Sequence, residues 1–157
     1  MSAEITLKFI GMIYTPYSKK ENTPIQGCFA PNNKGYIELL PEYTEGLQGI
    51  SGFSHLILIY FFHQAEGCAL LTKPFLDKDK KGIFAIRHFN RPNPIGLSVV
   101  KLYGVKDNIL NIGGVDMLDG TPLLDIKPYV PEFDIKEDAK SGWLQDASER
   151  AKYQVEE

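Results

Sequence analysis

The stretch His55-Leu56-Ile57-Leu58-Ile59-Tyr60-Phe61-Phe62 is the most hydrophobic run of the chain and predicts a central β-strand. Around it, apolar residues recur with a period of two or gather in short runs, and helical spacing is rare. The expected strands cover residues 5–14, 36–40, 55–62, 83–86, 97–105, 109–115 and 123–127. This pattern predicts a mainly β protein of roughly seven strands.

The connections between these strands carry strong turn signals. Residues 15–34 form a long loop with three prolines, residues 41–50 resemble a short helix or turn, and residues 106–108 predict a tight turn. Residues 146–156 predict a terminal helix. We expect this helix to pack through Trp143, Leu144 and Tyr153. Because so few helices are available to cover the sheet edges, we expect a closed or nearly closed barrel.

Length and composition favour one compact domain. The chain has 157 residues, 43% of them hydrophobic and 24% charged, which is an ordinary globular composition. We expect a single domain of residues 1–157, with residues 130–157 as a C-terminal helical arm. No long apolar run and no secretory signal is visible, so we expect a cytoplasmic protein that does not cross a membrane. Cys28 and Cys68 are expected to be unpaired thiols.

The charge is distributed unevenly. The net charge is -3, but residues 1–105 carry 11 basic and 8 acidic side chains, whereas residues 106–157 carry 6 and 12. A basic face for a polyanion is available from Lys73, Lys78, Lys80, Lys81, Arg87, Arg91 and Lys101. The alternative is that residues 78–81 are simply a solvated loop tip.

Two dense polar segments, residues 87–98 and 115–129, predict the functional site. Each interleaves charged side chains with proline and glycine, which shape the backbone into stiff turns. The three histidines lack the spacing of a helical zinc site, and no glycine-rich nucleotide fingerprint occurs, so we expect neither a metal nor a Rossmann-type site. His63 ends an apolar strand and is a candidate site residue, whereas His55 is expected to be structural.

Two aspartates in the second dense segment allow alternative interpretations. Asp119-Gly120 predicts a turn in which the Asp side chain bonds nearby backbone and Gly takes a positive φ. Asp125 interrupts an apolar strand and therefore needs an exposed face or a cationic partner. The partner is either Lys127, on the same face of the strand, or one of the arginines Arg87 and Arg91.

Five motifs occur in order between residues 8 and 134. They are Tyr14-Thr15-Pro16-Tyr17, Gly52-Phe53-Ser54-His55-Leu56, Phe62-His63-Gln64, Arg91-Pro92-Asn93-Pro94-Ile95-Gly96-Leu97-Ser98, and Asp119-Gly120-Thr121-Pro122 with Asp125-Ile126-Lys127-Pro128-Tyr129. Together they resemble the motifs of the TrmO family, also called TsaA-like proteins. The resemblance implies a single-sheet β-barrel that binds S-adenosyl-L-methionine, works as a homodimer and methylates N6 of threonylcarbamoyl-adenosine next to the tRNA anticodon.

The resemblance also implies two sets of site residues. The cofactor set comprises Gln26, Gly27, His63, Gln64, Arg87, Asp116, Met117 and Leu118. Its carboxylate, amide and arginine suit the polar groups of the cofactor, and Met117 with Leu118 can enclose adenine. The acceptor set, expected to be catalytic, comprises Arg91, Asn93, Asp119, Asp125, Lys127 and Tyr129.

The resemblance leaves the acceptor and the base open. Transfer from a sulfonium needs alignment more than activation, so no metal is required. A weakly nucleophilic acceptor nitrogen benefits from losing its proton, to a nearby carboxylate or to His63. Many relatives carry a small or hydroxyl residue where His88 follows Arg87. A methyltransferase with a non-tRNA acceptor and a non-catalytic barrel that binds the cofactor or RNA therefore stay as alternatives.

Overall fold

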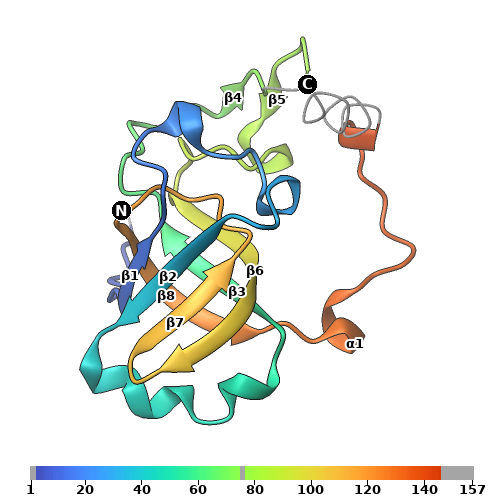
Figure 1. The fold of residues 1–157 in the computed structure, drawn as a ribbon. Helices are drawn as coiled ribbons and strands as arrows, with labels where there is room; N and C mark the ends of the chain where they lie inside the picture. The colour runs from blue at the N-terminus through green and yellow to red at the C-terminus, as the bar shows by residue number, and fades with distance from the viewer. Residues whose placement is uncertain (1–2, 75–76, 146–157) are drawn as a thin grey trace. The chain divides into compact units, whose positions relative to one another are not determined.

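A computed structural model describes residues 3–74 and 77–145 of the chain, which form two compact units (Figure 1). The first, called the barrel unit below, consists of Met1–His63 and Ile95–Tyr129. The second, called the insertion unit, consists of Gln64–Pro94 and Val130–Glu157. Each unit is described by itself.

The barrel unit is a closed antiparallel β-barrel. Its strands are β1 (Gly11–Tyr14), β2 (Lys34–Leu39), β3 (His55–Phe61), β6 (Ile95–Lys106), β7 (Ile109–Gly113) and β8 (Thr121–Pro128), joined in the order β1-β2-β7-β6-β3-β8. Closure leaves no unpaired strand edge, which removes the need for covering helices. The predicted mainly β fold and the closed barrel are thus confirmed, with six strands in the barrel among the described residues.

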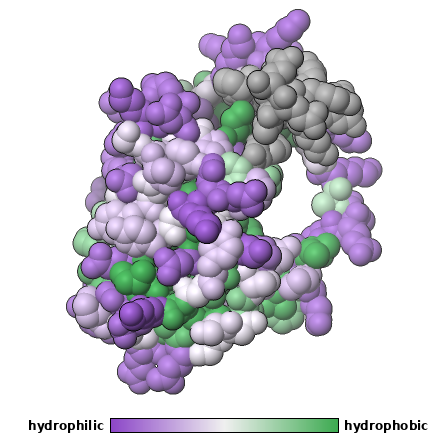
Figure 2. Space-filling model, in the orientation of Figure 1, coloured by the Kyte–Doolittle hydropathy of each residue, from purple (hydrophilic) through white to green (hydrophobic). Residues whose placement is uncertain are grey.

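Side chains along the strands point alternately into and out of the barrel, and the inward ones form the core. In β3, Leu56, Leu58 and Tyr60 point inward and are buried, whereas Ile57 and Ile59 point outward and are half-buried. Fully buried residues from the other strands complete the core, namely Ile13, Ile37, Val100, Leu110, Ile112 and Leu123. Each such side chain contributes about 1.5–3 kcal/mol through removal from water. Figure 2 shows that apolar residues (green) are also exposed among polar ones on the outside of the barrel.

Short 3-10 helices fill several connections of the barrel unit. Two of them, η1 (Lys20–Asn22) and η2 (Gly27–Phe29), lie in the long loop between β1 and β2. A third, η3 (Pro41–Leu47), confirms the short helix or turn predicted at residues 41–50, and a fourth, η4 (Ile50–Gly52), follows it. The predicted turn between β6 and β7 is confirmed too, with Asp107 in the left-handed region at a φ of 54°.

Two predicted strands differ from the structure. Residues 83–86 form a 3-10 helix, η5 (Ile83–Ala85), because Ile83 and Ile86 are buried while Phe84 and Ala85 face outward, a pattern of three rather than two. The first strand starts at Gly11, not at Ile5. Residues before it alternate apolar and polar side chains, but Ile5 and Leu7 are exposed and pair with no strand.

The insertion unit contains little regular structure. A two-stranded sheet joins β4 (Leu71–Thr72) to β5 (Lys81–Gly82), and the single described α-helix, α1, spans Pro131–Asp134. The predicted helix at residues 146–156 lies outside the described residues. Within the described part of the chain, no helix has the length and apolar character needed to cross a membrane.

Candidate functional site

Two loops of the barrel unit are bonded together at one end of the barrel. The backbone N–H of Gly27, in the β1–β2 loop, donates a hydrogen bond to Asp116 Oδ2 at 2.9 Å. Farther along the same loop, the carbonyl of Asn33 accepts a bond from Gly114 N at 2.8 Å. These contacts fix Asp116, which follows β7, against the long proline-containing loop.

Asp116 is also held from inside the barrel. The hydroxyl of Ser98 on β6 donates to Asp116 Oδ1 at 2.6 Å, and it shares a second hydrogen bond of 2.8 Å with the hydroxyl of Tyr60 on β3. Ser98 and Tyr60 are only 5% and 4% exposed, whereas Asp116 is half-buried. The three side chains therefore form a line of hydrogen bonds from the core to the surface, with the carboxylate at its outer end.

Close backbone approach explains two glycines of this region. A Cβ on Gly27 would lie 2.1 Å from the carbonyl oxygen of Gly114, so any side chain there forces the two loops apart. A Cβ on Gly96 would lie 2.3 Å from the ring of Tyr60. Gly96 thus makes room for the ring whose hydroxyl bonds Ser98 two residues later on the same strand.

Tyr17 adds a buried phenol to the same end of the barrel. Its ring is 8% exposed, and its hydroxyl accepts a hydrogen bond from the Asn33 side-chain amide. Burial raises the pKa of Tyr17, and the negative charge of Asp116 adds to this effect, while the bond from Asn33 opposes it. The phenol therefore stays protonated beside the Asp116 carboxylate at neutral pH.

Asp119 ties the start of β8 to the end of β1. Its Oδ1 accepts a hydrogen bond of 3.0 Å from the backbone N–H of Thr15, and its own N–H donates to the carbonyl of Tyr17 at 2.8 Å. Gly120 has a φ of 75°, which confirms the predicted turn. The expected local bond of the Asp119 side chain is wrong, since Thr15, whose N–H donates to it, lies 104 residues away in sequence.

His63 leaves the barrel just beyond the end of β3, three residues after Tyr60. Its side chain is half-buried, and desolvation lowers its pKa, an effect that a hydrogen bond with the Phe61 backbone partly opposes. The imidazole is therefore neutral at pH 7. His55, at the start of the same strand, shares a hydrogen bond of 2.8 Å with Ser54 and lies edge-on to Tyr129.

The remaining cofactor-set residues of the barrel unit adjoin Gly27 or Asp116 in the sequence. Gln26 precedes η2 directly and is half-buried. Met117 is 3% exposed and belongs to the core, and its carbonyl accepts a bond of 2.8 Å from Thr15 Oγ1. Leu118 is half-buried. Of the two residues expected to enclose adenine, Leu118 is thus the one with accessible side-chain surface.

The acceptor set of the barrel unit is divided between its two ends. Asp119 lies just before β8, whereas Lys127 and Tyr129 lie at the other end of that strand, where Tyr129 N bonds the carbonyl of His55 at 3.1 Å. The eight extended residues of β8 alone span about 26 Å. Within one barrel unit, these residues therefore do not meet at a single point.

Asp125 pairs with Lys127, the local one of its predicted partners. Their side chains form an ion pair of 2.9 Å and are 45% and 58% exposed, respectively. Both lie on the outer face of β8, where Asp125 stands opposite Ile59 and Lys127 opposite Ile57 of β3. Asp125 therefore satisfies both conditions that the sequence set for it, an exposed face and a cationic neighbour.

The other predicted site residues belong to the insertion unit. Gln64, Arg87 and Asn93 are exposed there. Arg91 is half-buried, and its Nη1 donates to the carbonyls of Ile86 and His88 at 2.9 and 3.2 Å, so it stabilises the turn of its own segment.

The sequence interpretation assigned no role to Ser98, Tyr60, Tyr17 or Asn33. Alternation did not identify Ser98, because its neighbours Leu97 and Val99 are apolar and would be expected to point inward, whereas the structure exposes them and buries Ser98. Among residues 3–74 and 77–145, no three His, Cys, Asp or Glu side chains gather closely enough to hold a metal ion.

Comparison with known proteins places these residues in a family context. The family model of the tRNA-methyltransferase O N-terminal domain matches residues 12–135. A probable S-adenosyl-L-methionine-binding protein of Pyrococcus abyssi is 53% identical over 136 residues, which cover 87% of this chain and 74% of that protein. The tRNA (adenine(37)-N6)-methyltransferase of Escherichia coli is 38% identical over 148 residues, covering 88% of this chain and 63% of that protein.

Solved structures agree with this similarity. A crystal structure of TrmO from Pseudomonas aeruginosa matches with a TM-score of 0.77 and 41% identity, covering 89% of this chain and 62% of that chain. The chain thus spans less than two thirds of the length of the Escherichia coli enzyme and of the Pseudomonas aeruginosa structure.

Proposed function

The chain belongs to the tRNA-methyltransferase O N-terminal domain family, and on this premise we propose that it is a methyltransferase that uses S-adenosyl-L-methionine to methylate tRNA. The proposed acceptor is N6 of threonylcarbamoyl-adenosine next to the anticodon, which implies a cytoplasmic enzyme. The observation that carries the proposal is the Asp116 carboxylate, held half-buried at the barrel end by Gly27 and Ser98. Similar proteins are named as binding this cofactor or as methylating adenine 37 of tRNA.

The residues at the barrel end fit such a cofactor in their chemistry. The negative charge of Asp116 complements the positive sulfonium and amino groups. Neutral His63 adds no positive charge that would repel them. Because Gly27 has no side chain, only backbone atoms lie where its loop meets Gly114. Gln26, next to Gly27, and Leu118, two residues after Asp116, add a half-buried amide and a half-buried apolar side chain.

The reaction requires alignment and removal of one proton. When bound, S-adenosyl-L-methionine supplies a methyl group that is already activated for in-line displacement. The acceptor N6 would have to give up its proton as it gains the methyl group. His63 is suited to accept it, because its lowered pKa keeps the imidazole neutral. Gly27 and Ser98 donate hydrogen bonds to Asp116 that hold this carboxylate and its loop in place. The loop therefore need not rearrange during methyl transfer.

A homodimer would unite the divided acceptor set. Asp119 and Lys127 lie at opposite ends of β8, so a second copy in antiparallel orientation is the simplest way to bring such groups together. The outer face of β3 and β6 offers an apolar contact surface, with Phe61 opposite Ile95 and residues 38–50% exposed. Its exposed members are Phe61, Ile95, Leu97 and Val99. Light scattering is expected to give the mass of two chains, and the mass of one chain would contradict this part.

Mass spectrometry of tRNA nucleosides tests the reaction. Cells that lack the gene should lose the N6-methyl derivative of threonylcarbamoyl-adenosine, and purified protein with cofactor should restore it on their tRNA. A tRNA with unmodified adenosine at the same position is the matched control and should stay unmethylated. Unchanged nucleosides in the mutant, together with cofactor binding by the pure protein, would point to another acceptor.

A further inference from the structure

The insertion unit contains a basic segment between residues 64 and 94. This segment carries six Lys or Arg and three Asp or Glu residues, a net charge of +3, although the whole chain carries -3. Lys78, Lys80 and Arg87 are exposed within it. A local excess of exposed positive charge in an acidic protein favours contact with a polyanion.

Phe84 stands out within the basic segment. It lies on η5 (Ile83–Ala85), and its side chain is 79% exposed. Ile83, the first residue of this turn, and Ile86, the residue after it, are buried, at 1% and 8% exposure. The two buried anchors fix the backbone, so the exposed ring is presented from a rigid support. The exposed face of this ring is available for stacking on a planar ligand.

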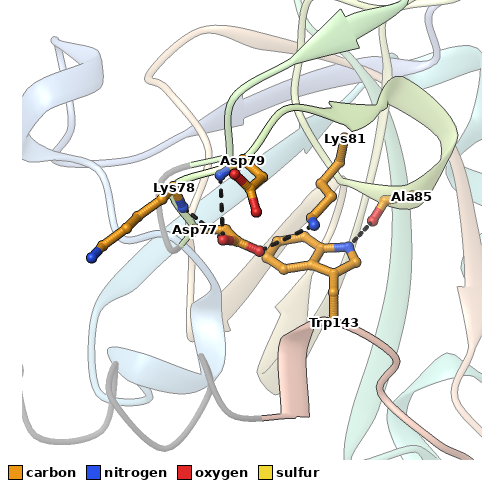
Figure 3. Close-up of polar contacts among 6 residues, drawn as sticks. All are labelled: Asp77, Lys78, Asp79, Lys81, Ala85 and Trp143. Carbon is orange, nitrogen blue, oxygen red and sulfur yellow. Dashed lines mark hydrogen bonds and ion pairs between the residues drawn. The ribbon is translucent and has the colours of Figure 1, made fainter.

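Hydrogen bonds hold the backbone on both sides of Phe84. The indole Nε1 of Trp143 donates to the carbonyl of Ala85 at 2.9 Å (Figure 3). Before the turn, Ile83 N donates to the carbonyl of Leu70 at 2.9 Å. Lys81 pairs with Asp77 at 3.3 Å and lies 5.9 Å from the centroid of the Trp143 ring (Figure 3). This preorganisation lowers the entropy that a ligand must overcome when it contacts the ring.

We propose that the Phe84 ring stacks on an unpaired base of the RNA substrate, while the cations of the basic segment contact neighbouring phosphates. The inference rests on the proposed function, because it presupposes an RNA acceptor. Every base presents a π-face, so stacking on an aromatic side chain is tolerant of sequence and suits single-stranded loops. Leu70 and Leu71 of the same segment are also exposed, at 64% each, but the net positive charge of the segment favours a nucleic acid over an apolar protein partner.

The chain provides a matched control in Phe133. Its side chain is 70% exposed on α1 (Pro131–Asp134), also in the insertion unit. Its neighbours are Glu132 and Asp134, so this ring lies in an acidic setting. Phe133 should therefore not contact RNA, although its size and exposure resemble those of Phe84.

The test measures binding of the full-length protein to an anticodon stem–loop RNA. Phe84→Ala should raise the RNA Kd about tenfold or more, which is the usual effect of losing one stacked base. Phe84→Tyr should keep the wild-type Kd, and Phe133→Ala should stay within about twofold of it. The Kd for S-adenosyl-L-methionine should be the same in all variants. With 2-aminopurine in the RNA loop, stacking quenches fluorescence, and this quenching should be lost only in Phe84→Ala.

Three results would overturn the inference, and they are distinguishable. If Phe84→Ala retains both RNA affinity and quenching, the ring does not stack on RNA. If it changes the mass in light scattering but not the RNA Kd, the ring is a protein contact. If the wild-type protein binds cofactor but neither binds nor methylates tRNA, the proposed function fails and this inference with it.

Discussion

The end of the barrel and the basic segment of the insertion unit are both rich in polar residues, but they use them in opposite ways. At the barrel end, Asp116 accepts hydrogen bonds at both oxygens, and Ser98 and Tyr60 are buried behind it. In the basic segment, Lys78 and Lys80 face solvent, and Phe84 is mostly exposed. The polar groups of the first region bond one another, whereas the second region leaves charged and aromatic side chains accessible to solvent.

This difference predicts how each region responds to substitution. Changes at the barrel end should disturb stability and cofactor binding together, because the same contacts serve both. Changes in the basic segment should leave stability intact and alter only RNA binding, since exposed side chains contribute little to folding.

The largest expected effect is that of Gly27→Ala. The added Cβ would meet the Gly114 carbonyl oxygen at 2.1 Å, so the two loops must separate. Unfolding free energy should fall by about 2–3 kcal/mol, and affinity for S-adenosyl-L-methionine should fall at least about tenfold. Denaturant unfolding and calorimetric titration measure the two effects. Gly46→Ala, where the Cβ has nothing within 4 Å, is the control. Equal behaviour of the two variants would show that the loop contact is unimportant.

Asp116→Asn should come next. The amide offers only one acceptor oxygen, so either Gly27 N or Ser98 Oγ loses its partner or faces an N–H. Losing such a bond costs about 1–3 kcal/mol, and the loss of negative charge should weaken cofactor binding about tenfold. Asp79→Asn, at an exposed carboxylate of the basic segment, is the matched control and should bind cofactor normally. If calorimetry gives the same cofactor Kd for Asp116→Asn and Asp79→Asn, the barrel end is no more important for cofactor binding than the basic segment.

Asp125→Asn should have a smaller and more selective effect. Its ion pair with Lys127 is about half exposed, so it contributes less than about 1 kcal/mol to stability. We expect turnover with tRNA to fall by up to about tenfold while the cofactor Kd is unchanged. Single-turnover methylation and calorimetry separate these quantities. A variant with full turnover on the cognate tRNA would remove Asp125 from the mechanism.

The smallest expected effect is the pH dependence of kcat/KM that arises from His63. The pKa of His63 is lowered from 6.5, so the neutral form predominates at pH 6.5 and above and is lost only as the pH falls through the lowered value. The kcat/KM for S-adenosyl-L-methionine should therefore still exceed half of its plateau at about pH 6.5. His63→Gln should lower the plateau and flatten the acid limb. A wild-type midpoint above that pH would contradict the role of neutral His63.

The fold was largely predictable from the sequence because strand alternation is a local signal. His55–Phe61 alternates inward and outward residues, and the turn at Asp107 follows from its immediate neighbours. The 3-10 helix at Ile83–Ala85 was not predictable in this way, since four apolar-rich residues fit a strand as well as a helical turn.

The candidate site was predictable only in part, because its decisive contacts join distant segments. The bond between Gly27 and Asp116 spans 89 residues, and that between Ser98 and Asp116 spans 18. Motif resemblance named Gly27 and Asp116, but only the barrel register shows that Ser98 and Tyr60 support the carboxylate from inside. The same register separates Asp119 from Lys127, which residue spacing alone did not reveal.

A crystal structure with S-adenosylhomocysteine, the demethylated form of the cofactor, would decide whether the cofactor binds beside Asp116. We expect this ligand at the end of the barrel, in contact with the Gly27 loop and with the Asp116 carboxylate, while the bonds from Gly27 N and Ser98 Oγ persist. A ligand bound elsewhere on the chain, or bound at this end only after those two bonds have broken, would contradict this expectation.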